Sequence, residues 1–222
     1  MKQLVLLALL LLLPLNMSVS AQRRAPRRPA FPEVSLELAD VFDMVCAERT
    51  KQPIDPAAVK ELGTRLDSFR QHWRAEAPRL LGAVPTVTGV PFRRRELWAA
   101  LFLCHLPSMN TPLMISVRHY LTGAPNGPAP LSIFSNTVFH EVLHIYVGDI
   151  VDSLPGQTTP LIEKYKSEHP AVLSHLHLYA IEALVYRRLG RENELEAVFA
   201  FERRFPRPAL AAKAREIVAA EM

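Results

Sequence analysis

The feature that most constrains this chain is the stretch Leu131–Val151, in which apolar residues surround two histidines and one glutamate. A segment rich in proline and glycine, 123–130, precedes the stretch, and a segment rich in Ser, Thr and Pro, 153–160, follows it. Such segments are typical of loops, so both ends of the stretch are marked. The pattern between them predicts a long α-helix. Because charged residues are sparse in it, this helix must be buried over most of its surface.

Within the predicted helix, His140, Glu141 and His144 form the pattern HExxH. Residues four positions apart lie on one helix face with Cβ atoms about 5–6 Å apart, so the two imidazoles can share one tetrahedral zinc ion. Glu141 lies about one-quarter turn round the helix, beside the metal without binding it. From there its carboxylate can take a proton from a zinc-bound water and return it to a leaving amine. Glu141 is therefore the candidate catalytic residue.

The residues on either side of HExxH also fit a longer known pattern. The ten residues TVFHEVLHIY, 137–146, resemble the extended signature of the zincin metallopeptidases. Thr137 stands three residues before the first histidine, where that family favours Val or Thr, and no charge or proline interrupts the remaining flanks. The resemblance implies a zinc metallopeptidase, a hydrolase that uses one Zn²⁺ ion and a metal-activated water to cut peptide bonds in a peptide or protein substrate.

A catalytic zinc ion needs three protein ligands and an open position. The metzincin subgroup continues as HExxHxxGxxH, but here the glycine comes one residue late, at Gly148, and Ile150 stands where the third histidine should be. That subgroup is excluded. The gluzincin subgroup takes a glutamate from a later helix, and the region of this chain that fits is Pro170–Leu189.

Three residues in that region are candidate third ligands, namely Glu182, His177 and His175. Glu182 ranks first, because it is a lone carboxylate among apolar neighbours and a buried carboxylate needs a partner such as a metal. His177 ranks second and His175 third. Glu182 and His175 are seven residues apart and share one stripe of the helix. If Glu182 binds the zinc, His175 is expected behind the ligands or facing the substrate.

The whole pattern predicts an α+β fold that is predominantly α-helical, with a zincin-like active-site helix. Periodicity indicates helices over 33–49 and 56–81, and a C-terminal helical region that starts at Pro170. Two apolar runs, 97–106 and 113–121, flank turn residues and predict a β-hairpin or small sheet.

In the zincin fold, the strand before the active-site helix is a sheet edge that pairs with the substrate backbone, and the resemblance gives that part to 113–121. Arg118, His119 and Tyr120 close this run. His119 and Tyr120 are therefore candidate contacts to the substrate or to an oxyanion.

The N-terminus predicts export. Lys2 and the apolar run Leu4–Leu13 lead to small residues that end at Ala21, which is typical of a signal peptide spanning 1–21 and cleaved before Gln22. The apolar run is shorter than the roughly 20 residues that span a bilayer, so no membrane association is expected after cleavage. The mature chain is then periplasmic or secreted.

An oxidising compartment allows Cys46 and Cys104 to form a disulfide, as exported bacterial chains with two cysteines often do. Two cysteines are too few for a disulfide scaffold or a four-cysteine zinc ribbon. The sequence therefore predicts one bridge within one domain, 33–222.

Charge argues against a nucleic-acid partner. The whole chain has 26 basic and 22 acidic residues, but the leader holds one lysine and the Arg- and Pro-rich tail, 22–32, holds four arginines and no acid. Residues 33–222 therefore carry 21 basic against 22 acidic side chains. The basicity belongs to an extended tail, and no nucleic-acid recognition motif accompanies it.

An alternative interpretation is a non-enzymatic periplasmic helical domain that binds a protein partner and has a structural or vestigial metal site. The segment 183–208 resembles one helix pair of a tetratricopeptide array, although stacking needs about three such repeats. Glu141 separates the two interpretations, because a structural site does not need a carboxylate between its histidines.

Overall fold

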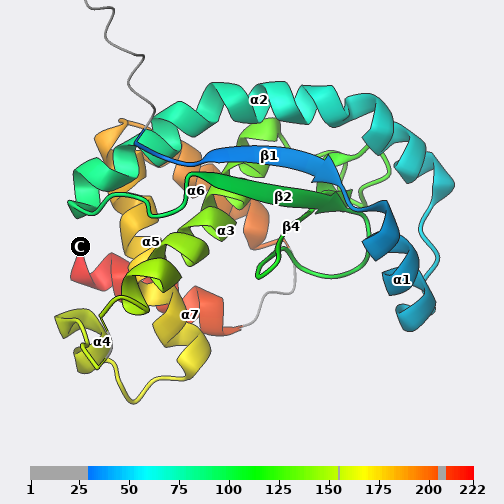
Figure 1. Cartoon of the computed structure of the whole chain (residues 1–222). Helices are drawn as coiled ribbons and strands as arrows, with labels where there is room; N and C mark the ends of the chain where they lie inside the picture. Colours follow the sequence, from blue (N-terminus) through cyan, green and yellow to red (C-terminus); the bar gives the residue numbers. More distant parts are fainter. Residues whose placement is uncertain (1–29, 155, 205–208) are drawn as a thin grey trace, which may run out of the picture.

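The computed structural model describes residues 30–154, 156–204 and 209–222. The predicted signal peptide, 1–21, and residues 22–29 of the tail lie outside the described residues. The chain has an α+β fold that is mostly helical, with a small mixed sheet and a set of C-terminal helices, as the sequence predicts (Figure 1).

The sheet has four strands in the order β1-β2-β4-β3: β1 (Glu33–Leu38), β2 (Glu96–Phe102), β3 (Met109–Asn110) and β4 (Leu113–Ser116). The predicted hairpin between 97–106 and 113–121 is wrong, because β2 and β4 pair in parallel. The turn residues between the two runs do reverse the chain, but they join β3 to β4 in antiparallel pairing.

The predicted helix over 33–49 is wrong in its first part. Residues 33–38 form β1, and α1 (Asp40–Thr50) follows after a single residue. Val34 and Leu36 are buried while Glu33 and Glu37 are exposed, which is the two-residue period of a strand. Parallel pairing with β2 places Val34 opposite Leu97, so a contact some 60 residues away decides the conformation.

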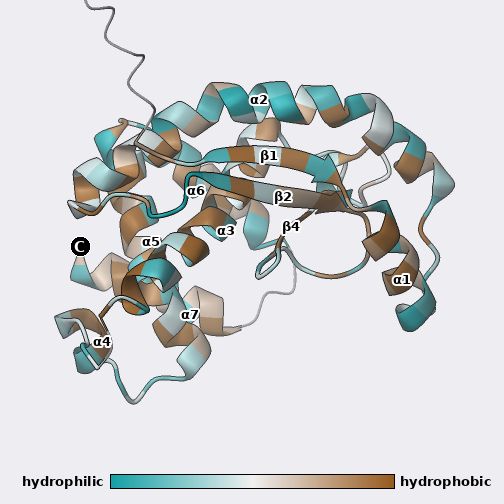
Figure 2. Ribbon diagram, in the orientation of Figure 1, coloured by the Kyte–Doolittle hydropathy of each residue, from teal (hydrophilic) through white to brown (hydrophobic). Residues whose placement is uncertain are grey.

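The helix α2 (Pro56–Thr88) begins as predicted, with Pro56 in its first turn and the Asp55 side chain accepting a hydrogen bond from the Ala57 N–H. It runs past the predicted end near Leu81 and stops at Gly89, which has a φ of 71°. Buried residues continue to Val84, so packing against the core outweighs the local breakers. Its outward side is hydrophilic, whereas β2 and the later helix α3 (Leu131–Val151) are mostly hydrophobic (Figure 2).

The helix α3 (Leu131–Val151) has the predicted bounds and lies in the interior, in contact with α2, α5 and the sheet. Four further helices follow it: α4 (Pro160–Lys164), α5 (Pro170–Arg188), α6 (Glu192–Glu202) and α7 (Ala209–Glu221). The core of the molecule lies between the sheet and the helices α2, α3 and α5. This arrangement holds α3 and α5 side by side, which positions the candidate site.

The predicted disulfide is present, with the Cα atoms of Cys46 and Cys104 6.1 Å apart. It joins α1 to the chain just after β2. Beside it, the buried carboxylate of Asp43 accepts hydrogen bonds from the Leu103 N–H (2.8 Å) and the Cys104 N–H (2.9 Å). The bridge is consistent with an oxidising location outside the cytoplasm. Among the described helices, none combines the length and the apolar character needed to cross a bilayer.

Candidate metal centre

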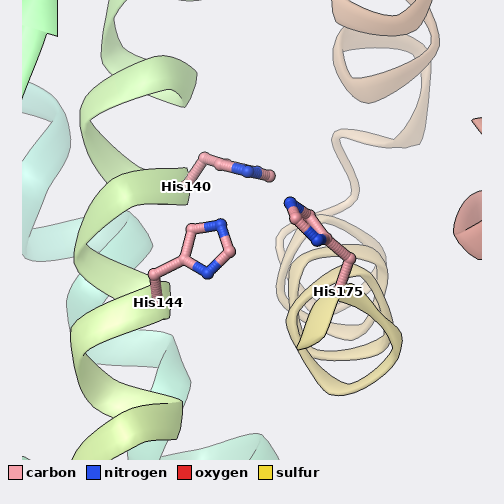
Figure 3. A group of neighbouring side chains, drawn as sticks. All are labelled: His140, His144 and His175. Atoms are coloured by element: carbon pink, nitrogen blue, oxygen red, sulfur yellow. The ribbon is translucent and has the colours of Figure 1, made fainter. Parts of the chain in front are cut away.

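Three histidines from two helices converge in the interior. His140 and His144 project from α3 and His175 projects from α5, and Figure 3 shows the three rings turned toward one another. Each ring offers one ligand nitrogen, and these three atoms all lie within 4.8 Å of one another. The ring centres of His144 and His175 are 4.7 Å apart, and those of His140 and His144 are 5.0 Å apart. The three partly buried side chains form a group that could hold a metal ion.

Local sequence explains why each ring points inward. The four-residue spacing places His140 and His144 on one face of α3. On α5, Leu176 and Leu178 are fully buried and fix the rotation of the helix about its axis. His175, one turn into α5, then faces α3 across the gap between the two helices.

Hydrogen bonding orients the ring of His175. Its Nδ1 atom lies 2.8 Å from the carbonyl oxygen of Ala171, one turn earlier on α5. A carbonyl oxygen can only accept, so Nδ1 carries the proton and donates it. The lone pair of Nε2 is then available as a metal ligand, which is the usual arrangement for a metal-binding histidine.

Burial and the neighbouring rings keep the imidazole of His144 uncharged. Burial, followed by the charges of His140 and His175, lowers the pKa of His144 to about 3. Its imidazole is therefore neutral at physiological pH, and the neutral form is the one that binds metals.

The structure places Glu182 behind the histidine group and not within it. Glu182 is 1% exposed, and its Oε1 atom accepts a hydrogen bond of 2.7 Å from the side-chain amide of Asn136. The same oxygen lies 3.9 Å from Nδ1 of His140. The amide of Asn136 also reaches the hydroxyl of Tyr186, at 3.3 Å. Burial and the charge of Glu182 raise the pKa of that hydroxyl, which keeps it protonated.

This placement bears on the three candidate third ligands. His175, ranked third, lies with His140 and His144, whereas Glu182, ranked first, lies outside this group, with its Oε1 atom 3.9 Å from Nδ1 of His140. His177, ranked second, is engaged elsewhere, with Nε2 2.6 Å from the hydroxyl of Thr159 at the start of α4. Two residues correspond to about 200° of helix rotation, so His177 points away from the side that carries His175.

A cleft of about 600 Å³ opens beside the histidines. His140, Glu141 and His175 line it on one side, and His119 and Tyr120 line it on another. Glu141 is 8% exposed, and the cleft that it lines is large enough for part of a peptide. The structure thus brings the predicted catalytic residue and the predicted substrate contacts to one cavity.

The strand predicted over 113–121 ends early, and its part as a sheet edge is wrong. β4 stops at Ser116, a 3-10 helix η1 (Arg118–Tyr120) follows, and β3 covers the outer side of β4. The N–H of Ser116 donates to the hydroxyl of Ser108, which closes the remaining edge. A substrate strand therefore has no free edge at β4 within the described part of the chain.

His119 and Tyr120 differ in their surroundings. Tyr120 is 3% exposed, and its hydroxyl lies 2.7 Å from that of Thr137, one turn before His140 on α3. This contact ties η1 to the helix of the metal centre. His119 lies with its ring centre 6.5 Å from that of Phe201, and burial, with the charges of Arg118 and His105, lowers its pKa.

Sequence reasoning does not single out Tyr179, although it belongs to the site. Its ring centre lies 5.5 Å from those of both His140 and His175, and it lines the same cleft. Its hydroxyl accepts a hydrogen bond of 3.3 Å from Arg215 on α7. Tyr179 follows His175 by four residues, so the helical spacing was a signal that could have found it.

No protein-family model, no curated protein and no solved structure matches the chain. The features of the chain that bear on function are therefore the histidines of α3 and α5 and the cleft that these helices line together with η1.

Proposed function

We propose that this protein is an exported zinc metallopeptidase that hydrolyses peptide bonds. One observation supports the proposal above all: the three imidazoles of His140, His144 and His175 converge, and His140 and His175 line a cleft together with Glu141. Three protein ligands, an open side and an adjacent carboxylate are the components of a hydrolytic zinc site. The predicted leader and the disulfide between Cys46 and Cys104 support the exported location.

The donor set suits zinc. Neutral imidazole nitrogens favour zinc and other transition metals over magnesium or calcium, which prefer oxygen ligands. Nδ1 of His175 donates its proton to Ala171, and Nδ1 of His140 lies 3.9 Å from the carboxylate of Glu182, which favours Nε2 as the ligand atom of both rings. A zinc ion bound by three histidines lowers the pKa of its water to about 7 and polarises a substrate carbonyl.

Glu141 supplies the proton transfers. Its carboxylate lies on the wall of the cleft, one residue after the ligand His140. It accepts a proton from the attacking water as the water adds to the carbonyl carbon, and it then delivers that proton to the departing nitrogen. Both proton transfers use the same carboxylate. Replacing Glu141 with a residue whose side chain cannot ionise is therefore expected to stop the reaction.

The cleft favours catalysis over the alternative of a structural metal site in a protein-binding domain. Structural zinc sites are closed by four protein ligands, whereas here a three-histidine group borders a cavity of about 600 Å³. A structural zinc site also does not need a carboxylate beside its ligands, whereas Glu141 lies beside His140 on the wall of this cleft.

Two measurements on the mature protein test the proposal. We expect about one zinc per chain by mass spectrometry of the metal content. We also expect the wild type to cleave a mixed peptide library, and Glu141→Gln to lose about 10²–10⁴-fold in rate while keeping its zinc. Absence of zinc from the wild type contradicts the metal centre, and a library left intact by a zinc-loaded wild type contradicts the peptidase. Cleavage that survives Glu141→Gln contradicts the assigned base.

A further inference from the structure

A second group of polar side chains lines the same cleft and carries positive charge. It contains Arg118, His105 and the serines Ser108 and Ser116. β2 and β4 are parallel, so their carboxyl ends lie at the same edge of the sheet. His105 follows the end of β2 and Arg118 follows the end of β4, which brings the two side chains together. Ligands in open sheets with parallel strands bind outside this end of the strands.

Arg118 has no carboxylate partner among the residues that the structure describes. Its Nη1 atom donates to Nδ1 of His105, and its buried Nε–H meets no acceptor in the described part of the chain. Burial lowers the pKa of Arg118, with no opposing effect from a nearby acid. A partly buried guanidinium without an anion is unfavourable, because desolvation of the charge is not compensated.

The other poorly exposed arginines of the structure show the contrast. Arg191 pairs with Glu76 and Glu194, and Arg215 pairs with Glu202. These arginine side chains are 17% and 15% exposed, and each has a carboxylate that compensates its charge. Arg118 is the exception, and it lines a cleft.

A buried hydroxyl beside Arg118 also lacks a partner. Ser116 is 7% exposed, and its Oγ atom makes no hydrogen bond to any residue that the structure describes. Ser108 accepts from the N–H of Ser116, which leaves the Ser108 hydroxyl proton to be donated. The cleft therefore holds a guanidinium N–H and hydroxyl donors, which together suit an acceptor with two oxygens.

The position of this group relative to the metal centre is fixed by hydrogen bonds. Arg118 begins η1, and Tyr120 two residues later bonds to Thr137, one turn before His140 on α3. One cavity includes both Arg118 and Glu141 in its wall. A peptide whose scissile bond lies at Glu141 can thus place a neighbouring carboxylate at Arg118.

We infer that Arg118, with the hydroxyls of Ser108 and Ser116, binds a carboxylate of the substrate, so that the preferred substrates are peptides with an anionic group near the scissile bond. This inference rests on the proposed function and names its substrate class. The carboxylate has two sources, the C-terminus of a peptide or the side chain of Asp or Glu. Both present the same two-oxygen anion to the guanidinium.

Matched peptide pairs test the inference and separate the two sources. One pair has the same sequence with a free or an amidated C-terminus, and the other has Glu or Gln next to the cleavage site. A hydrogen-bonded charge pair in a cleft corresponds to a preference of about 10–100-fold in kcat/KM. We expect the wild type to show this preference in one pair and Arg118→Gln to reduce the ratio toward one. Arg93→Gln removes the same charge from an exposed position and is expected to keep the ratio.

A binding measurement gives a readout that does not need turnover. In the Glu141→Gln background, fluorescence anisotropy of labelled peptides should show the same Kd preference for the anionic member, and adding Arg118→Gln should remove it. Equal kcat/KM and equal Kd within both pairs would overturn the inference and leave the peptidase intact. A preference that persists after Arg118→Gln would overturn it as well. Arg118-dependent binding without any cleavage by the wild type supports the anion site and contradicts the proposed function instead.

Discussion

The carboxylate oxygen Oε1 of Glu182 lies 3.9 Å from Nδ1 of His140, and Glu182 does not belong to the group of three histidine nitrogens that lie within 4.8 Å of one another. The same oxygen is held by the side-chain amide of Asn136 at 2.7 Å. In the proposed zinc site, a carboxylate in this position would favour the Nδ1–H form of the ring and leave its Nε2 atom to bind the metal. Glu182 is thus arranged to orient a ligand.

Changing Glu182 should therefore weaken zinc binding without abolishing it. We expect Glu182→Gln to lower zinc affinity about 10–100-fold, as is usual for the loss of a group that orients a ligand. Competition with a fluorescent chelator measures the affinity, and Glu163→Gln, at a surface pair with Lys166, serves as the control. Complete loss of zinc from Glu182→Gln would instead make Glu182 a ligand.

Replacing His175 should have the larger effect. His175→Ala removes one of three ligand nitrogens, so we expect the purified variant to retain less than about one-tenth of the wild-type zinc after dialysis. His177→Ala is the matched control, since it removes an imidazole two residues away that contacts Thr159. A zinc content that falls in His177→Ala but not in His175→Ala would refute the grouping of His175 with His140 and His144.

Zinc should also stabilise the folded chain. An ion that binds only the native state, at a free concentration of 100 times its Kd, raises the free energy of unfolding by about 2.7 kcal/mol. For a domain of this size, that corresponds to a rise of roughly 5–10 °C in the Tm. We expect this rise when zinc is added to the metal-stripped wild type, and a much smaller rise in His144→Ala. Equal shifts in the two proteins would indicate that zinc binds elsewhere.

The stability of the segment after η1 should depend on pH through Glu61 of α2. Its carboxylate accepts hydrogen bonds from the N–H of Thr122, at 3.0 Å from each oxygen, and from Arg65, also at 3.0 Å. Burial acts to raise the pKa of Glu61, but these bonds outweigh it and hold the pKa below its usual value. The stabilisation is thus present above the unfolded-state pKa and is lost as the pH falls through the lower folded-state value.

We expect Glu61→Gln to lower the free energy of unfolding by about 1 kcal/mol at pH 7, after allowance for its partial exposure. The difference from wild type should shrink below about pH 4.3, where the carboxylate of the unfolded chain becomes protonated. Urea unfolding at pH 7 and pH 3.5 checks this. A difference that stays constant or grows on acidification would show that the charge of Glu61 contributes nothing.

The bridge between Cys46 and Cys104 should stabilise the domain measurably. The two cysteines are separated by 58 positions in the sequence. For a loop of this length, the lower entropy of the cross-linked unfolded chain is expected to stabilise the fold by roughly 4 kcal/mol. We expect the double variant Cys46→Ser, Cys104→Ser to have a Tm about 5–15 °C below that of the oxidised wild type. Reductant should lower the Tm of the wild type and leave that of the double variant unchanged. Equal Tm values for the two oxidised proteins would contradict this.

Local patterns accounted for the parts of the fold that depend on near neighbours. The bounds of α3 and the placement of His140, Glu141 and His144 follow from spacing within one helix, and the structure agrees with both. The strand β1 could not be read in this way. Its apolar positions fit a helix as well as a strand, and pairing with β2, far along the chain, decides between them.

The identity of the residue on α5 that joins His140 and His144 could not be predicted from local spacing either. The sequence placed Glu182 and His175 on one face of a helix, and in the structure both do face α3. Seven residues separate them by about 10 Å along the axis, so at most one is level with His140 and His144. Which of them is level depends on how far α5 slides along α3, and packing of the core sets that offset.

Cys104 directly precedes His105, which lines the cleft together with Arg118. The covalent link to α1 and the hydrogen bonds from the Leu103 and Cys104 N–H groups to Asp43 therefore lie directly before a residue of the cleft wall. The thiols join only where the surroundings are oxidising. In the proposed export route, this covalent link beside His105 forms only after the chain has left the cytoplasm, so the cleft reaches its final shape in the compartment where the protein is proposed to act.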